Sequence, residues 1–246
     1  MRLAIKVLLF IVLTILTQVG GVVLLLSLAL HRLVDRKVAV PWQRVLTKVM
    51  LFVVLYLSVT FAVVPSLAGL TGRVRMPLTQ HNHVKPATLV TCLLNRNYVR
   101  PQLRDVVYDV ATVMHQRDTT FTLCYLDACF PFGNGFPLFP HLSHNDGKKI
   151  DLAFVYRSAT DNTLANSSPS FIGYGISEGP QPGEEDKPAF CKSCGYVQYG
   201  FLNKIVPQQN QQHYVLDKAL TALLVKQLVT DSRTGKLFIE PHLKQR

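Results

Sequence analysis

Two long uncharged runs dominate the first third of the chain. One covers residues 7–30 and the other residues 49–72, and each contains 24 residues without a charge. A helix needs about 20 apolar residues to cross a bilayer, and in lipid its backbone polar groups must pair within the segment. The pattern therefore predicts two transmembrane helices and a basic loop, which together form a membrane anchor over residues 1–72.

A cleaved signal peptide is the alternative interpretation of the first run. The apolar core of such a peptide usually spans only about 7–15 residues and precedes a cleavage site of small residues. The run at 7–30 is longer, and Ser27-Leu28-Ala29 is a poor cleavage site. We therefore favour a helix that stays in the mature protein.

After the anchor, the apolar pattern changes between helical and extended periods. Helical spacing occurs over 102–115 and 213–229, whereas strand composition occurs over 119–126, 150–156 and 236–243. This order predicts an α+β domain over residues 95–246, with a small antiparallel sheet and flanking helices. Residues 73–94 have the composition of a linker, and the Pro/Gly/Ser-rich stretch at 158–190 is expected to be a long surface loop.

The net charge of +11 does not by itself fix the orientation in a membrane. Loops rich in Lys and Arg favour the cytoplasm. The loop between the two runs holds five basic residues, and the segments outside the runs hold another five: Arg2, Lys6, Arg73, Arg75 and Lys85. The chain has no basic helix with interleaved aromatic residues, so we expect no nucleic-acid partner.

Five cysteines follow the membrane anchor: Cys92, Cys124, Cys129, Cys191 and Cys194. In an oxidising compartment they would form disulfides, which is the interpretation we favour. A structural zinc ion held by the last four of them is the alternative, because C-x-x-C also occurs in metal sites.

The most informative segment is 141–152, which contains the pattern H-x-S-H-x-x-G-x-x-x-D. His144 is expected in a loop just before the strand that carries Asp151. Gly147 tolerates the positive φ of a tight turn between them. Imidazole and carboxylate are both good zinc ligands, so His144 and Asp151 are predicted to bind one Zn2+ ion.

A second candidate pair, Glu240 and His242, lies near the end of the chain. In a strand, residues i and i+2 point to the same face, so both side chains could face the same ion. His242 is the predicted third ligand, and Glu240 is the predicted catalytic base that takes a proton from water. Three protein ligands and one water are typical of a catalytic zinc site.

These residues resemble a superfamily of zinc peptidases. It includes D-Ala-D-Ala dipeptidases, D,D-carboxypeptidases, the penicillin-insensitive murein endopeptidase and lysostaphin-type enzymes, and the hedgehog signalling domain shares its fold. His144, Gly147 and Asp151 match the H-x-x-G-x-x-x-D pattern of the D-Ala-D-Ala group. Ser143 matches the serine that precedes the ligand in the murein endopeptidase group, and His141 lies two positions earlier. We expect Ser143 and His141 to support the ligands.

The resemblance covers roughly residues 95–246, with two departures. The dipeptidases have Glu three positions before the last ligand, whereas Glu240 precedes His242 by two. The murein endopeptidase has the gap of two but carries His at the base position, so this chain combines two patterns. No Arg occurs between Thr119 and Ser143, which argues against strict recognition of a terminal D-Ala carboxylate.

The resemblance implies a zinc metallopeptidase of the D,D-carboxypeptidase or murein endopeptidase type. Its expected substrates are peptide bonds in peptidoglycan stem peptides or cross-links. Because peptidoglycan lies outside the bacterial inner membrane, the catalytic domain is expected to be periplasmic or extracellular. The N-terminus would lie on that same side, with the basic loop in the cytoplasm. A non-catalytic zinc module that binds the cell wall or a partner protein is the main alternative, and an amidase-like peptide hydrolase is a further one.

Overall fold

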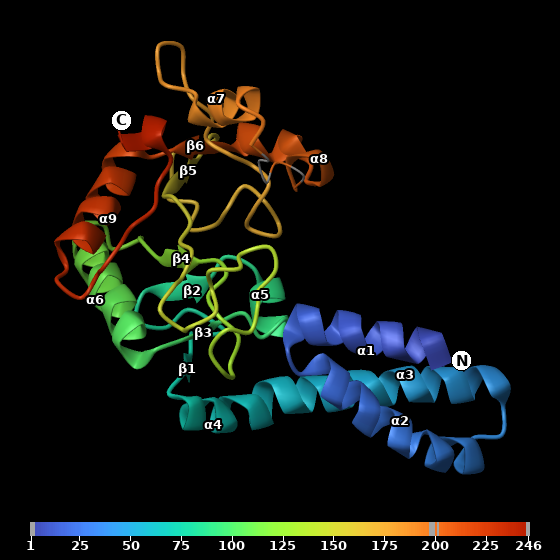
Figure 1. Ribbon diagram of the computed structural model, residues 1–246. Coiled ribbons are helices and arrows are strands. Elements are labelled where there is room, and N and C mark those ends of the chain that lie inside the picture. Colours follow the sequence, from blue (N-terminus) through green and yellow to red (C-terminus); the bar gives the residue numbers. More distant parts are fainter. Residues whose placement is uncertain (1–2, 197–199, 201, 245–246) are drawn as a thin grey trace. The chain divides into compact units, whose positions relative to one another are not determined.

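The computed structural model describes residues 3–196, 200 and 202–244, and its fold is mixed α+β (Figure 1). The chain forms two compact units, and each is assembled from separate segments. The first unit comprises residues 1–76, 89–104 and 127–151, and the second comprises residues 77–88, 105–126 and 152–246. The chain therefore passes several times from one unit to the other.

The first unit contains the apolar helices and one small sheet. Its helices are α1 (Leu3–Thr17), α2 (Gly20–Lys37), α3 (Pro41–Ser58), α4 (Val64–Ala68) and α5 (Leu89–Leu93). Its strands β1 (Val74–Arg75) and β3 (Tyr98–Val99) pair antiparallel. Val19, Val64, Ala68 and Tyr98 form a buried cluster in this unit. The segment 127–151, which contains the first predicted zinc motif, belongs to the same unit.

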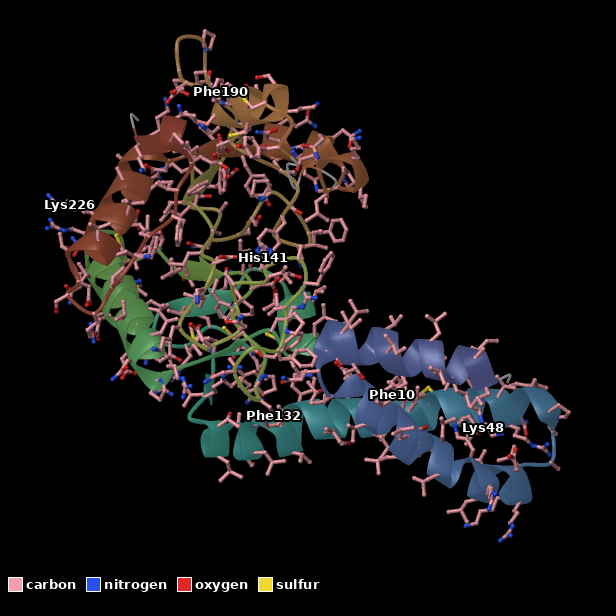
Figure 2. All side chains as sticks on the ribbon, viewed as in Figure 1. Phe10, Lys48, Phe132, His141, Phe190 and Lys226 are labelled. Atoms are coloured by element: carbon pink, nitrogen blue, oxygen red, sulfur yellow. The ribbon has the colours of Figure 1, made fainter. Side chains whose placement is uncertain are left out.

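The first uncharged run does not form one transmembrane helix, so that prediction is wrong. The run is split between α1 and α2 at Gln18, whose φ of 65° lies in the left-handed region. The chain reverses there, and α2 packs against both α1 and α3. Phe132 lies near the end of the helices where the chain reverses, and Lys48 lies toward the opposite end (Figure 2).

The second uncharged run lies within a continuous helical stretch, as predicted. Residues 41–71 are the one helix in the described part of the chain that is long and apolar enough to cross a membrane, with a mean hydropathy of 2.3. A π-helical turn at Val59–Val63 interrupts the α-helical hydrogen bonding just before Pro65. Proline has no N–H to donate, and a local change of helix type accommodates that loss.

The second unit contains the remaining helices and two further sheets. Its helices are α6 (Pro101–Arg117, which begins in the first unit), α7 (Lys187–Ser193), α8 (Leu202–Ile205) and α9 (Lys218–Thr230). Strands β2 (Val84–Pro86) and β4 (Leu123–Tyr125) pair in parallel, and β5 (Tyr156–Ser158) and β6 (Tyr214–Leu216) pair antiparallel. The predicted helices at 102–115 and 213–229 are thus confirmed in outline, the second beginning five residues late.

Two of the predicted strands are wrong. The segment predicted over 150–156 contains an isolated bridge from Leu152 to Tyr125, and β5 starts only at Tyr156. The last strand, predicted over 236–243, is irregular and ends in the 3-10 helix Pro241–Lys244. Pro241 cannot donate a ladder hydrogen bond, which disfavours a strand at this position. The i, i+2 argument that placed Glu240 and His242 on one strand face therefore does not apply.

All five cysteines are free thiols, so the predicted disulfides are wrong. Two of the buried thiols take part in local hydrogen bonds instead. The Cys124 thiol donates to the carbonyl oxygen of Asn166 at 3.0 Å, and Cys129 Sγ accepts from the amide of Gly147 at 3.2 Å. Burial raises the pKa of Cys124 to about 11, so this thiol stays protonated at neutral pH.

These environments predict selective alkylation. In the native chain at neutral pH, iodoacetamide is expected to modify Cys191 and Cys194, whereas the buried Cys92, Cys124 and Cys129 stay unmodified, because reaction needs an accessible thiolate. Peptide mapping by mass spectrometry measures the modification at each position. Denaturant should bring all five to similar labelling, and native labelling of Cys124 as fast as that of Cys194 would contradict the buried environment.

Candidate metal centre

His144 is buried and has a defined orientation in the loop that follows Phe130. Its backbone amide donates to the carbonyl of His141 at 2.9 Å, which closes a turn and brings the two rings together with centroids 5.4 Å apart. Nδ1 of His144 lies 2.9 Å from the carbonyl oxygen of Ala128. A carbonyl oxygen only accepts, so Nδ1 carries a proton and Nε2 is left as the coordinating atom.

Asp151 faces both histidines. Its Oδ1 lies 3.2 Å from Nε2 of His144, and its Oδ2 lies 3.5 Å from Nδ1 of His141. One donor atom from each residue lies within 4.8 Å of the other two, so the three residues could hold one metal ion. Two ligand atoms at about 2.1 Å from a tetrahedral zinc ion lie about 3.4 Å apart. The separations of Asp151 from His144 and His141 are therefore close to those of ligands that share an ion.

The protonation of the two imidazoles differs. For His144, burial would lower the pKa, but the hydrogen bond and charge of Asp151 raise it above the ordinary value. For His141, burial lowers the pKa even though Asp151 opposes the shift, so this ring favours the neutral form that binds metals. Nδ1 of His144 already carries a proton, so in the neutral ring Nε2 has only a lone pair, which cannot bond to the Asp151 carboxylate. The close approach of Nε2 to Asp151 therefore requires either a second proton on Nε2 or a metal cation between the two groups.

A buried ion pair stabilises the backbone that holds the candidate metal ligands His144 and Asp151. Arg96 Nη1 lies 3.2 Å from Asp127 Oδ2, and both side chains are less than a tenth exposed. The backbone carbonyl of Asp127 accepts from the amide of Asp151 at 2.8 Å, and the amide of Ala128 donates to the carbonyl of Arg96 at 2.7 Å. The Arg96–Asp127 pair therefore fixes the two consecutive carbonyls that hold Asp151 and His144. Such outer partners orient metal ligands.

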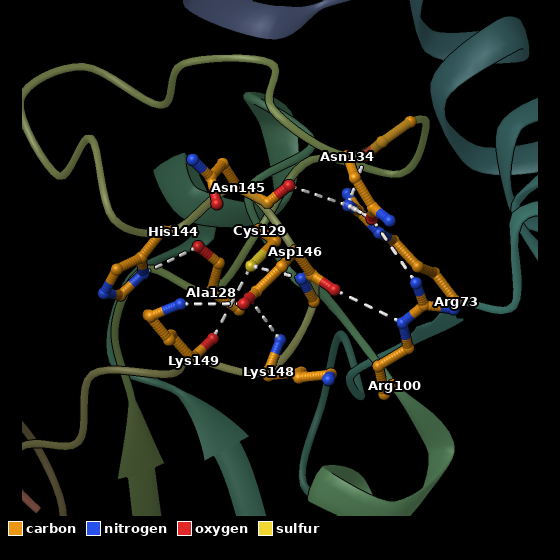
Figure 3. A network of polar contacts seen from close by, with 12 residues as sticks. Arg73, Arg100, Ala128, Cys129, Asn134, His144, Asn145, Asp146, Lys148 and Lys149 are labelled. Carbon is orange, nitrogen blue, oxygen red and sulfur yellow. Dashed lines mark hydrogen bonds and ion pairs between the residues drawn. The ribbon is translucent and has the colours of Figure 1, made fainter. Parts of the chain in front are cut away.

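The loop between the two motif ligands is held by a second network (Figure 3). Gly147 has a φ of 80°, which confirms the predicted use of glycine at a tight turn. Its carbonyl accepts from the amide of Arg100 at 2.7 Å, and Arg100 Nε donates to the carbonyl of Asp146 at 3.2 Å. The buried Arg73 guanidinium donates to the carbonyl of Asn145 in this loop at 3.2 Å, and also to the carbonyls of Phe130 and Gly133 ahead of it. These two arginines fix the path of the loop.

The remaining predicted site residues lie outside the cluster. Ser143 is exposed, between the two clustered histidines. Glu240 and His242 belong to the second unit, where His242 is buried and its Nε2 lies 2.6 Å from the carbonyl oxygen of Glu178. Their roles as base and third ligand stay predictions. The cluster instead supplies a third donor from His141, for which the sequence pattern predicted a supporting role.

Comparisons of the chain with protein-family models, curated proteins and solved structures found no match. The resemblance to zinc peptidases thus rests on the motif residues alone.

Proposed function

We propose that this chain is a membrane-anchored zinc peptidase that hydrolyses peptide bonds in peptidoglycan stem peptides or cross-links. The observation that carries the proposal is the convergence of His141, His144 and Asp151 within one loop segment. Two imidazoles and one carboxylate, with a further position for water, make up the ligand set of several catalytic zinc sites. The helix over 41–71 would hold such an enzyme at a bacterial inner membrane, with its catalytic part toward the periplasm.

The exposure of the cluster supports a catalytic rather than a purely structural ion. The side chain of His144 is 7% exposed, whereas those of His141 and Asp151 are 28% and 31% exposed. One side of the cluster is thus anchored in the protein and the other is open to solvent. Structural zinc sites are closed by protein ligands, whereas catalytic sites keep a position open for water and substrate.

The chain's own groups have separate roles in this proposal. Zinc held by the three residues supplies a Lewis acid that polarises the scissile carbonyl and makes water more acidic. Asp151 contributes negative charge that offsets part of the cation's charge, and the carbonyl of Ala128 keeps His144 in the coordinating tautomer. From the sequence pattern, Glu240 accepts the proton of the attacking water and passes it to the leaving amine.

The test uses the full-length chain, because the segment 127–151 and the membrane helices belong to one unit. Purified, zinc-loaded protein in detergent is incubated with cross-linked muropeptides, and mass spectrometry identifies the bond that is cut. We expect His144→Ala to lower the rate by about 100-fold or more, because Lewis-acid catalysis contributes several kcal/mol. Glu240→Gln should lower it by about 100- to 10,000-fold, the range for a general base. His213→Ala, at an exposed position, is the matched control.

The same experiment separates the alternatives. Stoichiometric zinc without hydrolysis of any muropeptide would reject the peptidase and favour a non-catalytic module that binds the wall or a partner. Full activity of His144→Ala would show that the cluster is not the reaction centre.

A further inference from the structure

The reversal between α1 and α2 is built into the sequence. Thr17 Oγ1 accepts from the amide of Gly20 at 2.9 Å, which satisfies one of the free N–H groups at the start of α2. A Cβ atom added at Gly20 or Gly21 would clash with the side chains of Thr17 or Thr14. Only glycine therefore lets the two helices approach so closely, and α1 and α2 form a tight antiparallel hairpin.

The tip of this hairpin, residues 17–20, is hydrogen-bonded to the segment 127–151. This segment contains His141, His144 and Asp151 and is called the site-bearing loop below. The Gln18 side chain donates from Nε2 to the carbonyl of Phe132 at 2.7 Å, and its Oε1 accepts from the amide of Phe132 at 3.0 Å. Val19 lies in the buried cluster with Val64 and Tyr98. The tip is thus fixed near α4, at the end of the helices that leads into β1.

The opposite end of the helices is strongly basic. The start of α1, the end of α2 and the start of α3 lie there together (Figure 1). Asp35 near the end of α2 pairs with Lys48 at 2.6 Å and with Arg44 at 3.5 Å, both on α3. Because the chain reverses at Gln18, Lys6 near the start of α1 joins the five basic residues around the turn at 38–40. That makes six basic residues at this end of the described helices, whereas Arg73 and Arg75 follow the long helix in the same unit.

Between these two ends the helices expose large apolar side chains on their outer faces. They include Leu8, Ile11, Ile15, Val22, Leu26, Val45, Val49 and Val54. Many large apolar side chains exposed along the same helices fit hydrocarbon rather than water. Basic residues at one end complement the anionic lipid headgroups of a cytoplasmic leaflet.

We propose that a single bilayer encloses the α1–α2 hairpin together with the helix over 41–71, with the N-terminus and the turn at 38–40 at the same anionic leaflet. The hairpin enters from the basic side, and its tip meets the site-bearing loop at the other face. This topology reverses the expected location of the N-terminus, because the first apolar run does not cross once but turns back. It does not depend on any enzymatic activity.

Cysteine accessibility in the full-length chain tests this topology. Single substitutions place reporters at the start of α1 (Ala4→Cys), at the turn (Ala39→Cys) and on the site-bearing loop (Lys148→Cys). Sealed membrane vesicles are treated with a membrane-impermeant maleimide before and after detergent opening, and peptide mapping reads each position. We expect the first two to share one accessibility and the third to show the opposite one. A protease-cleavable tag ahead of Met1 gives an independent measurement for the N-terminus.

Two results would overturn the proposal. Labelling of Ala4→Cys together with Lys148→Cys, but not with Ala39→Cys, would mean that the first run crosses once. Release of the chain by alkaline carbonate without detergent, as an oligomer with all three reporters accessible, would mean that a second copy covers the apolar faces.

Discussion

Replacing His144 by alanine is expected to lower the affinity of the full-length chain for zinc by more than about 100-fold. Loss of partners that only orient a ligand costs about 10- to 100-fold in metal affinity, and loss of a direct ligand should exceed that. His144 is the most buried of the three donors, and the Ala128 carbonyl fixes its ring. Competition with a chromophoric chelator measures the affinity, and elemental analysis of the purified chain gives the stoichiometry.

The affinity measurement must exclude zinc that binds to cysteine thiols instead of the His/Asp cluster. Cys191 and Cys194 form a C-x-x-C in the second unit and could bind zinc by themselves, so the measurement is made in a Cys191→Ser/Cys194→Ser background. His213→Ala should leave the affinity unchanged. If the wild-type cluster binds no divalent ion in that background, a proton on Nε2 of His144 takes the place of the metal. His144 and Asp151 then form an ordinary imidazolium–carboxylate pair.

The sequence was sufficient for part of this site. The spacing of His144, Gly147 and Asp151 identified two donors and the turn between them, because the glycine is needed for a positive φ. The role of His141 was missed, although two histidines three positions apart were visible. A turn closed by the His144 amide brings the rings together, and its closure depends on the neighbouring loop. The Ala128 carbonyl could not be found at all, since every residue has one.

The fold, like the site, was predictable from the sequence only in part. The helix over 101–117 followed from its apolar period, but the break in the first apolar run did not, although Gly20 and Gly21 marked it. A criterion based on the length and hydropathy of a run gives glycine no special weight. Physically, glycine lets the chain reverse direction and lets two helices come into close contact. The strand predicted over 236–243 was wrong because a single residue was overlooked. Pro241 has no N–H to donate to a strand ladder.

The buried pair beneath the ligands leads to the second large effect. Asp127→Ala is expected to destabilise the chain by about 3–5 kcal/mol, because it leaves the Arg96 guanidinium charged and unpaired in the interior. Zinc affinity should also fall by about 10- to 100-fold, since the carbonyls of residues 127 and 128 lose the side-chain anchor that orients Asp151 and His144. Urea unfolding in detergent micelles measures the first change, and chelator competition measures the second.

Two companion variants separate stability from ligand orientation. The exposed pair of Asp109 with Arg233 is the control, and Asp109→Ala should change stability far less than Asp127→Ala, with no change in zinc affinity. The apolar double replacement Arg96→Met/Asp127→Leu removes both buried charges and should recover most of the lost stability. If the pair orients the ligands, zinc affinity stays low in the double variant although the fold is restored. Full recovery of both would mean that the pair affects the ligands only through the stability of the fold.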